Sequence, residues 1–578
     1  MKLIEALEII KQGPPESAAF AVDLACGFTP LHFQTFLHAH LQRLFPGHKV
    51  VVRTGLFGDL LGNLERIEKD LPGNVVAVVE WEDLDPRLGI RRLGGWSPAQ
   101  LSDIVHGVER RAARIAETLE RLGRRGVVAL SLPTLPLPPA AFVPGWQAGS
   151  FESDLHAVAA ALGARLSRLT GVRLVSAQRL QRLSAPASRF DVKSTLRAGF
   201  PYSLPHADTL AGLVASLVRN PLPKKGLITD LDDTLWQGIL GEVNVEGIAW
   251  DLDHSAQRHG LYQQMLVSLG EAGALIAVAS KNEPALVEQA FREAGPILSR
   301  ERVFPLEANW GAKSASVARI LKAWNVGADS VVFVDDSPLE LAEVKKAHPE
   351  IECLLFPRDD DAATYQLLEA LRDLFGKQSV SDEDRIRLSS LRSSRDAEEA
   401  SASQGGSPEQ FLKEADGKLS VSFAKLPPDP RALELLNKTN QFNLNGKRHS
   451  EVSWADYRND PKVFLLTASY EDKFGPLGKI AVLAGRVEGE RLSIDHWVMS
   501  CRAFSRRVEH GCLEHLFRKF KTQEAWFDFA ATSRNGPTQD FFREILGVVP
   551  GKGFPVSRER FLEACPPIYL TIRELSDG

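Results

Sequence analysis

The sequence predicts a multidomain α/β protein, with two doubly wound parallel-sheet domains followed by an α+β domain. The length of 578 residues exceeds what one ordinary core accommodates. Short apolar runs alternate with helical patterns over about the first 375 residues, and this alternation is typical of parallel sheets with helices on both faces. Beyond residue 407, longer strand candidates follow one another directly, as they do in an α+β domain.

Residues 1–220 make up the first predicted domain. Its first ten residues have an amphipathic helical pattern, and a second helix is predicted over 101–122. Apolar runs of strand length lie between the helical stretches, at 20–26, 49–53, 75–79 and 126–130. Five prolines from Pro133 to Pro144 predict an irregular loop, since proline continues neither a helix nor an inner strand.

The second predicted domain covers residues 221–375 and has stronger strands, at 274–279 and 330–334. A polar, serine-rich stretch at 376–407 then predicts a linker made of a helix with a flexible tail. The third domain, 408–578, is predicted as α+β. Its expected elements are a meander of strands and then a helix, at 463–470, 479–487, 491–499 and near 508–519.

The composition excludes several classes of protein. The chain is 44% apolar and 25% charged, as globular proteins are, and its 69 basic and 74 acidic residues nearly cancel. This balance predicts neither nucleic-acid nor membrane partners. The longest apolar runs fall far short of the ~20 residues that span a bilayer. Five scattered cysteines without metal or disulfide spacing fit a reducing compartment, so a cytoplasmic location is expected.

Two carboxylates follow the first strand of the second domain. The apolar run 226–229 leads directly into Asp230, with Asp232 two positions later. Residues two apart project to the same side of an extended backbone, so the two carboxylates lie side by side. Their mutual repulsion requires a cation or a shared proton. Hard oxygen donors suit Mg²⁺ better than zinc, so the pair predicts a magnesium site for phosphate chemistry.

Further polar groups follow in order along the same domain. They are Ser280-Lys281-Asn282 after one strand, then Lys313, and Asp335-Asp336 after another strand. Ligands of open parallel sheets bind outside the carboxyl ends of the strands, so these groups are expected to converge with Asp230. Taken singly, an Asp-x-Asp pair indicates a solvated turn and a lone lysine a surface residue. The ordered set of four predicts one phosphate site.

The chemistry of each side chain suggests its role. Asp230 is the predicted nucleophile, since a carboxylate can attack a phosphoryl or activated acyl group and form a covalent intermediate. Asp232 is the predicted acid and base, which protonates the leaving oxygen and later deprotonates the incoming nucleophile. Lys313 and Ser280 are expected to bind the equatorial oxygens, where negative charge has to be stabilised.

Metal and substrate contacts complete the predicted site. Mg²⁺ is expected on Asp230, on the backbone carbonyl of Asp232 and on Asp336, where it offsets the repulsion between carboxylate and phosphate. Asp335 is the remaining residue of the metal site and is expected to support it from behind. The residues expected to contact a phosphorylated small-molecule substrate are Thr234, Lys281 and Asn282.

These residues resemble the signature of the FkbH-like family, within the haloacid-dehalogenase-like (HAD) superfamily, subfamily IIIC. The matching stretches are 230–236 with Gly238 and Gly241, 279–282, 309–310, 334–338, 437–444 and 200–205. The resemblance covers most of the chain. It implies an SGNH-hydrolase-like domain over 1–220, a minimally capped HAD-like Rossmannoid domain over 221–375, and a GNAT acetyltransferase-like domain over 408–578.

The resemblance also implies a reaction. The best-understood members take a glyceryl group from 1,3-bisphosphoglycerate, remove phosphate, and load the acyl unit onto an acyl carrier protein for natural-product assembly. Such relatives carry a cysteine just before the serine of the second motif, and it is thought to hold the acyl group as a thioester. This chain has Ala279 there, and a methyl group cannot form a thioester.

Three functions therefore stay open. In the first, the acyl unit still reaches a carrier, whose own thiol takes it directly, or the substrate differs. In the second, the protein is a plain Mg²⁺-dependent phosphatase of a small phosphorylated metabolite. In the third, it is a non-catalytic module that docks a carrier protein.

The flanking domains offer weaker signals. The first resembles SGNH hydrolases, yet no serine follows its first strand. Cys26 or Thr29 is the alternative nucleophile, with His206 as base, and a scaffolding or docking role is the other interpretation. In the third domain, the basic residues before the helix near 508 either form a solvated turn or meet a phosphopantetheine phosphate. They are Arg502, Arg506 and Arg507.

Overall fold

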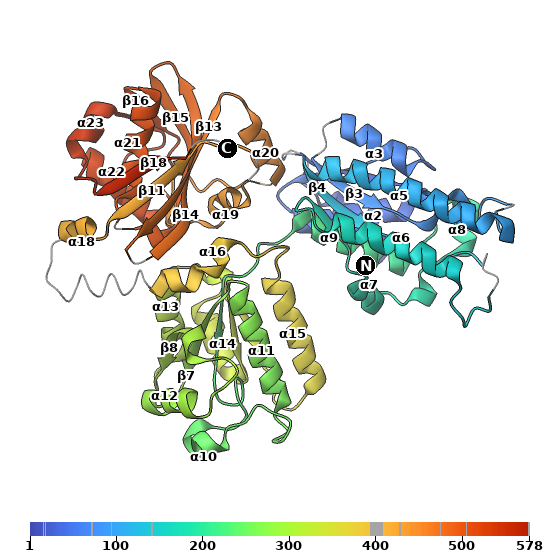
Figure 1. Cartoon of the computed structure of the whole chain (residues 1–578), viewed down its shortest axis with the longest axis horizontal. Helices are drawn as coiled ribbons and strands as arrows, with labels where there is room; N and C mark the ends of the chain where they lie inside the picture. Colours follow the sequence, from blue (N-terminus) through green and yellow to red (C-terminus); the bar gives the residue numbers. More distant parts are fainter. Residues whose placement is uncertain are drawn as a thin grey trace. The chain divides into compact units, whose positions relative to one another are not determined.

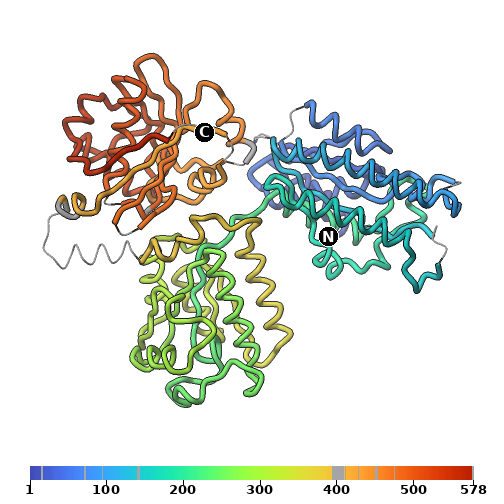
Figure 2. The backbone as a smooth tube through the Cα atoms, in the orientation of Figure 1, coloured from blue at the N-terminus to red at the C-terminus, as the bar shows by residue number. Residues whose placement is uncertain are grey.

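The structure is a computed structural model in which two compact units are distinguished (Figures 1 and 2). One consists of Met1–Pro221 with Ser450–Tyr457, and the other of Leu222–His449 with Arg458–Gly578. The described residues are 1–14, 17, 19–70, 73–93, 95–139, 143–392, 408–426, 429–449, 451–473, 475–504 and 506–575.

The first unit contains a five-stranded sheet in which every pairing is parallel, with the order β2-β1-β3-β4-β5. The strands are β1 (Ala19–Cys26), β2 (Lys49–Thr54), β3 (Asn74–Val78), β4 (Val127–Ser131) and β5 (Val172–Leu174). The first four match the predicted runs to within one residue, while the short β5 was not predicted.

Helices form most of the connections between these strands. They are α1 (Leu3–Lys11), α2 (Leu31–Leu44), α3 (Leu60–Lys69), α4 (Trp81–Leu84), α5 (Leu101–Gly123), α6 (Ser150–Leu166), α7 (Ala177–Leu183), α8 (Val192–Ala198) and α9 (Leu204–Arg219), with 3₁₀ turns η1 (Pro86–Leu88), η2 (Pro98–Gln100) and η3 (Pro186–Ser188). The predicted helices at the N-terminus and over 101–122 are confirmed as α1 and α5. In α5 the buried Ile104, Val108, Ile115 and Leu119 recur at helical spacing.

The sheet has a hydrophobic core on each face. Ala25 of β1 packs in a cluster with Leu119 of α5, whereas Leu24 and Cys26 of the same strand pack in a second cluster with Phe36 of α2. Successive side chains of a strand point to opposite faces, so the two clusters cover the two sides of the sheet. The doubly wound arrangement predicted for this region is therefore present.

The second unit begins with another five-stranded parallel sheet, with the order β10-β9-β6-β7-β8. The strands are β6 (Gly226–Thr229), β7 (Leu275–Ser280), β8 (Val303–Ala308), β9 (Val331–Asp335) and β10 (Glu352–Leu355). The helices are α10 (Leu240–Gly247), α11 (Gln257–Glu271), α12 (Pro284–Glu293), α13 (Lys313–Trp324), α14 (Pro338–Ala347), α15 (Asp361–Phe375) and α16 (Asp382–Arg385), with η4 (Arg300–Arg302) and η5 (Ala328–Ser330).

Alternation along β6 again divides the apolar side chains between two faces. Leu227 packs in a cluster with Leu266 of α11, and Ile228 packs in another with Val317 of α13. This burial fixes the register of the central strand, since a shift by one residue exchanges its two faces. The end of β6, and with it Asp230, is thereby held at a defined place.

The third sheet is mixed, with the order β17-β16-β15-β14-β13-β11-β18 and with β12 against β15. Its strands are β11 (Gly417–Ser422), β12 (Phe442–Asn443), β13 (Val463–Asp472), β14 (Gly475–Glu488), β15 (Arg491–Met499), β16 (Glu524–Phe527), β17 (Phe554–Ser557) and β18 (Leu570–Glu574). The helices are α18 (Pro408–Glu414), α19 (Pro430–Lys438), α21 (Val508–Phe520), α22 (Gly536–Leu546) and α23 (Arg558–Ala564), with η6 (Cys501–Ala503). Most of α20 (Glu451–Asn459) belongs to the first unit. The predicted meander is confirmed as β13–β15, followed by α21.

Residues 442–445 form a short insert segment between two parts of this sheet. β15 pairs with β16 over its first four residues and with β12 near its end. The N–H of Leu444 then donates to the carbonyl of Trp497 (2.9 Å), and the carbonyl of Leu444 accepts from the N–H of Ala530 (3.1 Å). The insert segment therefore bridges β15 and the chain that follows β16.

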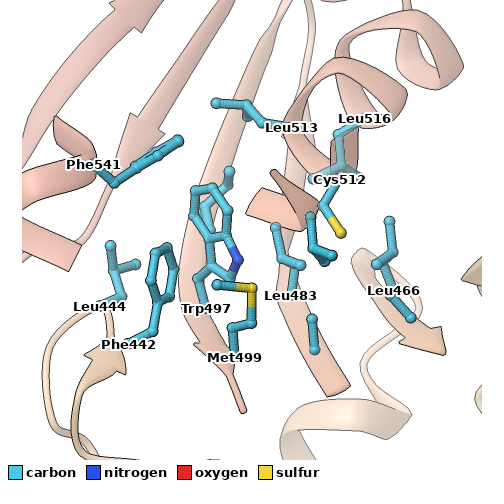
Figure 3. Packing of buried hydrophobic residues seen from close by; sticks show 14 of the residues in the cluster. Phe442, Leu444, Leu466, Leu483, Trp497, Met499, Cys512, Leu513, Leu516 and Phe541 are labelled. Atoms are coloured by element: carbon cyan, nitrogen blue, oxygen red, sulfur yellow. The ribbon is translucent and has the colours of Figure 1, made fainter. Parts of the chain in front are cut away.

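Apolar side chains fix the insert segment in place (Figure 3). Phe442 and Leu444 lie beside Trp497 and Phe541, and all four belong to the same buried cluster. The centroid of the Phe442 ring is 5.3 Å from the ring centroid of Trp497 and 6.0 Å from that of Phe541, and both contacts are edge-on. Such aromatic contacts add to the stabilisation from burial alone.

The mixed α/β class predicted from the sequence is confirmed, whereas the domain boundaries stay predictions. In the predicted linker, residues 382–385 and 387–392 are helical. The predicted flexible tail of the linker, from residue 393 onward, lies outside the described residues. The described residues of the proline-rich loop contain neither helix nor strand. None of the helices in the described ranges has both the length and the apolar character that crossing a bilayer requires.

Candidate active site

The candidate active site lies at the carboxyl edge of the β10-β9-β6-β7-β8 sheet. Asp230 directly follows β6, Ser280 ends β7 and Asp335 ends β9. Because β6 pairs in parallel with both β7 and β9, these three positions share one edge of the sheet. The sequence predicted that these groups converge, and the structure places them together.

Lys313 links the acids of two strands. Its Nζ lies 2.7 Å from Oδ2 of Asp230 and 2.6 Å from Oδ2 of Asp335. The three side chains are 5%, 8% and 0% exposed, respectively, so the ammonium and both carboxylates are removed from water. Buried charges of this kind are tolerated only when paired and hydrogen-bonded. Lys313 is the first residue of α13, whose apolar face packs on the sheet and so fixes the position of the ammonium.

The three groups shift one another's pKa values. Burial raises the pKa of Asp230, and Lys313 opposes this change. Burial and the Asp230 carboxylate raise the pKa of Asp335, again against Lys313. Burial lowers the pKa of Lys313, but the two carboxylates outweigh that effect and raise it. The ammonium is therefore held charged beside Asp230, where it can balance the charge of a bound phosphoryl group.

Asp232 is held by three hydrogen-bond donors. Its Oδ1 accepts from Nε1 of Trp236 (3.0 Å) and from the N–H of Leu240 (3.1 Å), and its Oδ2 accepts from Nδ2 of Asn282 (2.9 Å). Burial raises the pKa of Asp232, while these donors lower it. A carboxyl group with a raised pKa is better able to carry the proton that an acid/base role requires.

Asn282 connects the ends of β6 and β7. The same Nδ2 that donates to Asp232 also lies 3.2 Å from Oγ of Ser280. Ser280 and Asn282 are both buried, so they are in place beside the acid pair. Lys281 differs from its neighbours, because its Nζ pairs with Oε1 of Glu340 at 2.6 Å and its side chain is 41% exposed. Its predicted contact with substrate stays a prediction.

Asp336 is oriented by Thr234. The Thr234 hydroxyl donates to Oδ1 of Asp336 and accepts from the N–H of the same residue, both at 3.1 Å. Thr234 is fully buried, so its hydroxyl acts on Asp336 in this structure. Oδ2 of Asp336 is taken by Arg358, which donates from Nε and Nη2. Arg358 was not predicted as a site residue from the sequence. The apolar run 353–356 before it could have indicated one more strand end.

The acidic residues fit a divalent cation. Asp230, Asp335 and Asp336 can each place one carboxylate oxygen within 4.8 Å of the others. Oδ1 of Asp230 is buried and has no hydrogen-bond partner among the described residues. Asp335 instead uses both oxygens, on Lys313 and on the N–H of Ser337 (2.9 Å). Such hard oxygen donors suit Mg²⁺. Asp230 offers it an unpartnered oxygen, whereas Asp336 could bind it only through an oxygen that Thr234 or Arg358 now contacts.

Ala279 is fully buried near the end of β7. It packs in the same apolar cluster as Val317 of α13 and Phe333 of β9. Position 279 therefore contributes to the core, and its methyl group offers no nucleophile for holding an acyl group.

The candidate nucleophiles of the first unit are not paired with His206. Nε2 of His206 lies 3.0 Å from the Thr134 hydroxyl, and Nδ1 lies 2.9 Å from the Ser184 hydroxyl. Burial lowers the pKa of His206 to about 3, so the ring is neutral. Cys26 is buried with its thiol 3.4 Å from the carbonyl of Phe28, and burial raises its pKa. This environment keeps the thiol protonated and unreactive.

The three arginines before α21 bind groups of their own chain. Arg506 pairs with Asp472 at 3.1 Å, where the two side chains are 6% and 1% exposed. Nη1 of Arg502 donates to the Ser390 hydroxyl at 3.2 Å. Arg507 donates to the carbonyl of Pro567. Because Arg502 and Arg506 are buried, the alternative of a solvated basic turn is wrong for both, and contact with a phosphopantetheine phosphate stays a prediction.

Comparison with known proteins identifies the fold. No family model matches the chain, and no curated protein matches it. A solved structure that resembles it is the N-terminal part of the protein BF1531 from Bacteroides fragilis, which contains a phosphatase domain complexed with Mg. The TM-score is 0.52 at 18% sequence identity, and the match covers 66% of this chain and 100% of that chain. At this identity the likeness shows a shared fold.

Proposed function

We propose that this protein is a Mg²⁺-dependent phosphatase of the haloacid-dehalogenase-like type. The observation that supports this most strongly is the buried contact of Lys313 with Asp230, at the end of a central parallel strand and beside an acidic cluster suited to Mg²⁺. The resemblance of the sequence motifs adds support. So does the phosphatase domain with Mg in the similar structure from Bacteroides fragilis.

The residues divide the chemistry between them. Asp230 attacks the phosphorus atom and forms a phosphoaspartyl intermediate, while Asp232 gives its proton to the leaving oxygen. Asp232 then takes a proton from the incoming water, which releases phosphate and restores the aspartate. Lys313 and Ser280 stabilise the equatorial oxygens. Mg²⁺ on Asp230 and Asp336 supplies compensation for the negative charge of carboxylate and phosphate.

The test is phosphate release with an isosteric variant. Wild-type protein with millimolar Mg²⁺ is expected to release phosphate from p-nitrophenyl phosphate or acetyl phosphate. Asp230→Asn keeps the shape of the side chain but removes the nucleophile, so release is expected to fall to background. Asp253→Asn is the matched control, since Asp253 is exposed in a loop of the same sheet domain. Full activity of Asp230→Asn would falsify the assignment of the nucleophile.

The finer proposal concerns the substrate and the product. Under it, the enzyme dephosphorylates a phosphoglyceryl-type donor such as 1,3-bisphosphoglycerate and passes the acyl unit to an acyl carrier protein in biosynthesis, within the cytoplasm. Since Ala279 offers no thiol, the carrier's own thiol would attack the acyl carbon of the acyl phosphate, which forms the thioester and releases inorganic phosphate, while Asp230 would act on the remaining phosphate ester. Incubation with the donor, Mg²⁺ and a holo-carrier is expected to increase the carrier's mass by one acyl unit. An unchanged mass with every candidate carrier would contradict this proposal.

A plain phosphatase is the second candidate function, and the buried Ala279 is the observation that favours it. It predicts free phosphate from a small phosphorylated metabolite and no acylated carrier. A non-catalytic docking module remains the third. It predicts neither phosphate release nor binding of Mg²⁺ at millimolar concentration, so a Mg²⁺ titration separates it from the two enzymes. We propose SGNH-like and GNAT-like folds for the first and third domains, with scaffolding or docking roles.

A further inference from the structure

Arg358 reaches the candidate active site from the edge of the sheet. It follows β10, and the N–H of Phe356 donates to the carbonyl of Asp335 at 2.9 Å, which ties this segment to the end of β9. On the other side, the carboxylate of Asp360 accepts from the N–H of Ala363 and caps α15. The backbone of Arg358 is therefore fixed on both sides, while its long side chain is 54% exposed.

The guanidinium of Arg358 pairs with Asp336, one of the two acids proposed to hold the metal. Its Nε and Nη2 donate to Oδ2 of Asp336, whose side chain is 3% exposed. Oδ1 of the same carboxylate accepts from the Thr234 hydroxyl at 3.1 Å. Both oxygens of Asp336 are therefore occupied by the chain itself. Asp230 differs, because its Oδ1 is buried without a partner among the described residues.

A divalent cation and Arg358 compete for Asp336. An ion shared by Asp230 and Asp336 has to approach the carboxylate that Arg358 now holds. Like charges within a few ångströms repel strongly in a partly buried site, so the guanidinium has to withdraw when the ion enters. Asp233 gives it a nearby alternative, since Nη1 of Arg358 is already 3.8 Å from Oδ2 of Asp233.

We propose that the guanidinium of Arg358 leaves Asp336 when the divalent cation binds. It then binds a second anionic group of the phosphorylated substrate. This rests on the proposed phosphatase function. The planar fork of an arginine donates two parallel hydrogen bonds to a carboxylate or a phosphate group. Arg358 is a positioning residue for the metal and a specificity residue for the substrate, and the chemical step does not pass through it.

The first test is Mg²⁺ binding in the absence of substrate, measured by isothermal titration calorimetry. Arg358→Met keeps an unbranched apolar stem but removes the competing charge, so the dissociation constant for Mg²⁺ is expected to fall about tenfold, as for loss of one charged hydrogen-bond pair. Arg302→Met, a surface arginine paired with Glu271, is the control and is expected to bind Mg²⁺ as the wild type does. Unchanged or weaker Mg²⁺ binding by Arg358→Met overturns the competition. Equal urea midpoints confirm that each variant is folded.

The second test compares two phosphate esters that differ in one charge, 3-phosphoglycerate and glycerol 3-phosphate, at saturating Mg²⁺. The wild type is expected to prefer the carboxylate-bearing ester. In Arg358→Met the ratio of kcat/KM for the two esters is expected to fall about tenfold, because KM for 3-phosphoglycerate rises while kcat stays nearly unchanged. Arg358→Lys is expected to retain part of the preference. An equal preference in wild type and variant overturns the substrate role. Absence of phosphate release by the wild type instead overturns the proposed function and the substrate role together, while the Mg²⁺ titration still decides the competition.

Discussion

Nζ of Lys313 lies 2.7 Å from Oδ2 of Asp230, in a contact from which water is almost completely excluded. A sheet strand positions the carboxylate and a helix start positions the ammonium. The second acid on the same ammonium, Asp335, comes from the neighbouring strand β9. The arrangement thus couples the charge balance of the site to the packing of α13 on the sheet.

We expect Lys313→Met to impair both activity and stability. Phosphate release should fall at least ~100-fold, because a donor to the transition-state oxygens is lost. The free energy of unfolding should fall by about 3–5 kcal/mol, because two buried carboxylates lose their partner. Initial rates and urea unfolding measure the two effects. Arg319→Met, which removes an exposed pair with Glu307, is the control and should change neither. Stability equal to wild type would show that the pair is not structural.

Mg²⁺ is expected to stabilise the folded protein. An ion that binds only the native state adds about 2.7 kcal/mol at a concentration one hundred times its dissociation constant. Differential scanning fluorimetry with increasing MgCl₂, at constant ionic strength, should show a rising Tm. Asp336→Asn should lose most of that rise, since it removes a charged ligand, whereas the exposed Asp253→Asn should keep it. A rise of equal size in Asp336→Asn would contradict the assignment of this ligand.

The stability of the first unit is expected to depend on Glu80. Its carboxylate is fully buried and accepts hydrogen bonds from the hydroxyls of Thr134 and Tyr202, both at 2.7 Å. Burial raises the pKa of Glu80 from 4.5 to about 7. The folded state thus binds more protons than the unfolded state between these pH values. The contribution of Glu80 to the unfolding free energy should therefore fall by roughly 3 kcal/mol as pH rises from about 4.5 through 7, whereas His206, whose pKa is lowered to about 3, contributes with the opposite sign.

Hydrogen exchange of β3, followed by mass spectrometry and corrected for intrinsic rates, measures this dependence. Glu80→Gln, which does not titrate, should lack this contribution, so the unfolding free energy of the wild type relative to the variant should fall over the same window. The exposed Glu152→Gln is the control, and its profile should follow that of the wild type. A Glu80→Gln profile as steep as the wild-type profile would show that another group is responsible.

The insert segment is expected to prevent coenzyme A from binding to the third sheet. In the acetyltransferase-like fold that we propose for the third domain, the cofactor would bind at the turn before α21, and here residues 442–445 bridge β15 and the chain after β16. Acetyl-coenzyme A is therefore expected to leave the Tm unchanged. Phe442→Ala should lower the unfolding free energy by about 3–5 kcal/mol, as large-to-small core changes do. Phe423→Ala, at a partly buried position against the same cluster, should have a smaller effect.

The sequence predicted most strands because their apolar runs are short and bounded by polar residues. β1, β3, β4 and β15 illustrate this, since each lies inside its sheet and is mostly buried. It did not predict β5, β8, β10, β11, β12, β16, β17 and β18, of which β5 and β10 are only three and four residues long. Missing β10 also meant missing Arg358, whose place at the site depends on that strand.

The candidate site was predictable where a side chain follows a strand, as for Asp230, Ser280 and Asp335. The site was not predictable where a long side chain can reach more than one partner. Lys281 is adjacent to Ser280 but pairs with Glu340 on the surface, and only the path of α14 determines that choice. The catalytic and metal-binding roles of these residues stay predictions until the variants are measured.

The insert segment also affects how the third sheet can form during synthesis. Its Asn443 carbonyl accepts from Nδ2 of Asn535 (2.9 Å), a partner 92 residues later in the chain. At ~5–20 residues per second, that partner is made on the order of ten seconds after the insert segment itself. Until then Phe442 lacks Phe541, one of the rings against which it packs. A ribosome-bound chain that stops between these residues therefore exposes an apolar stretch that a chaperone can bind.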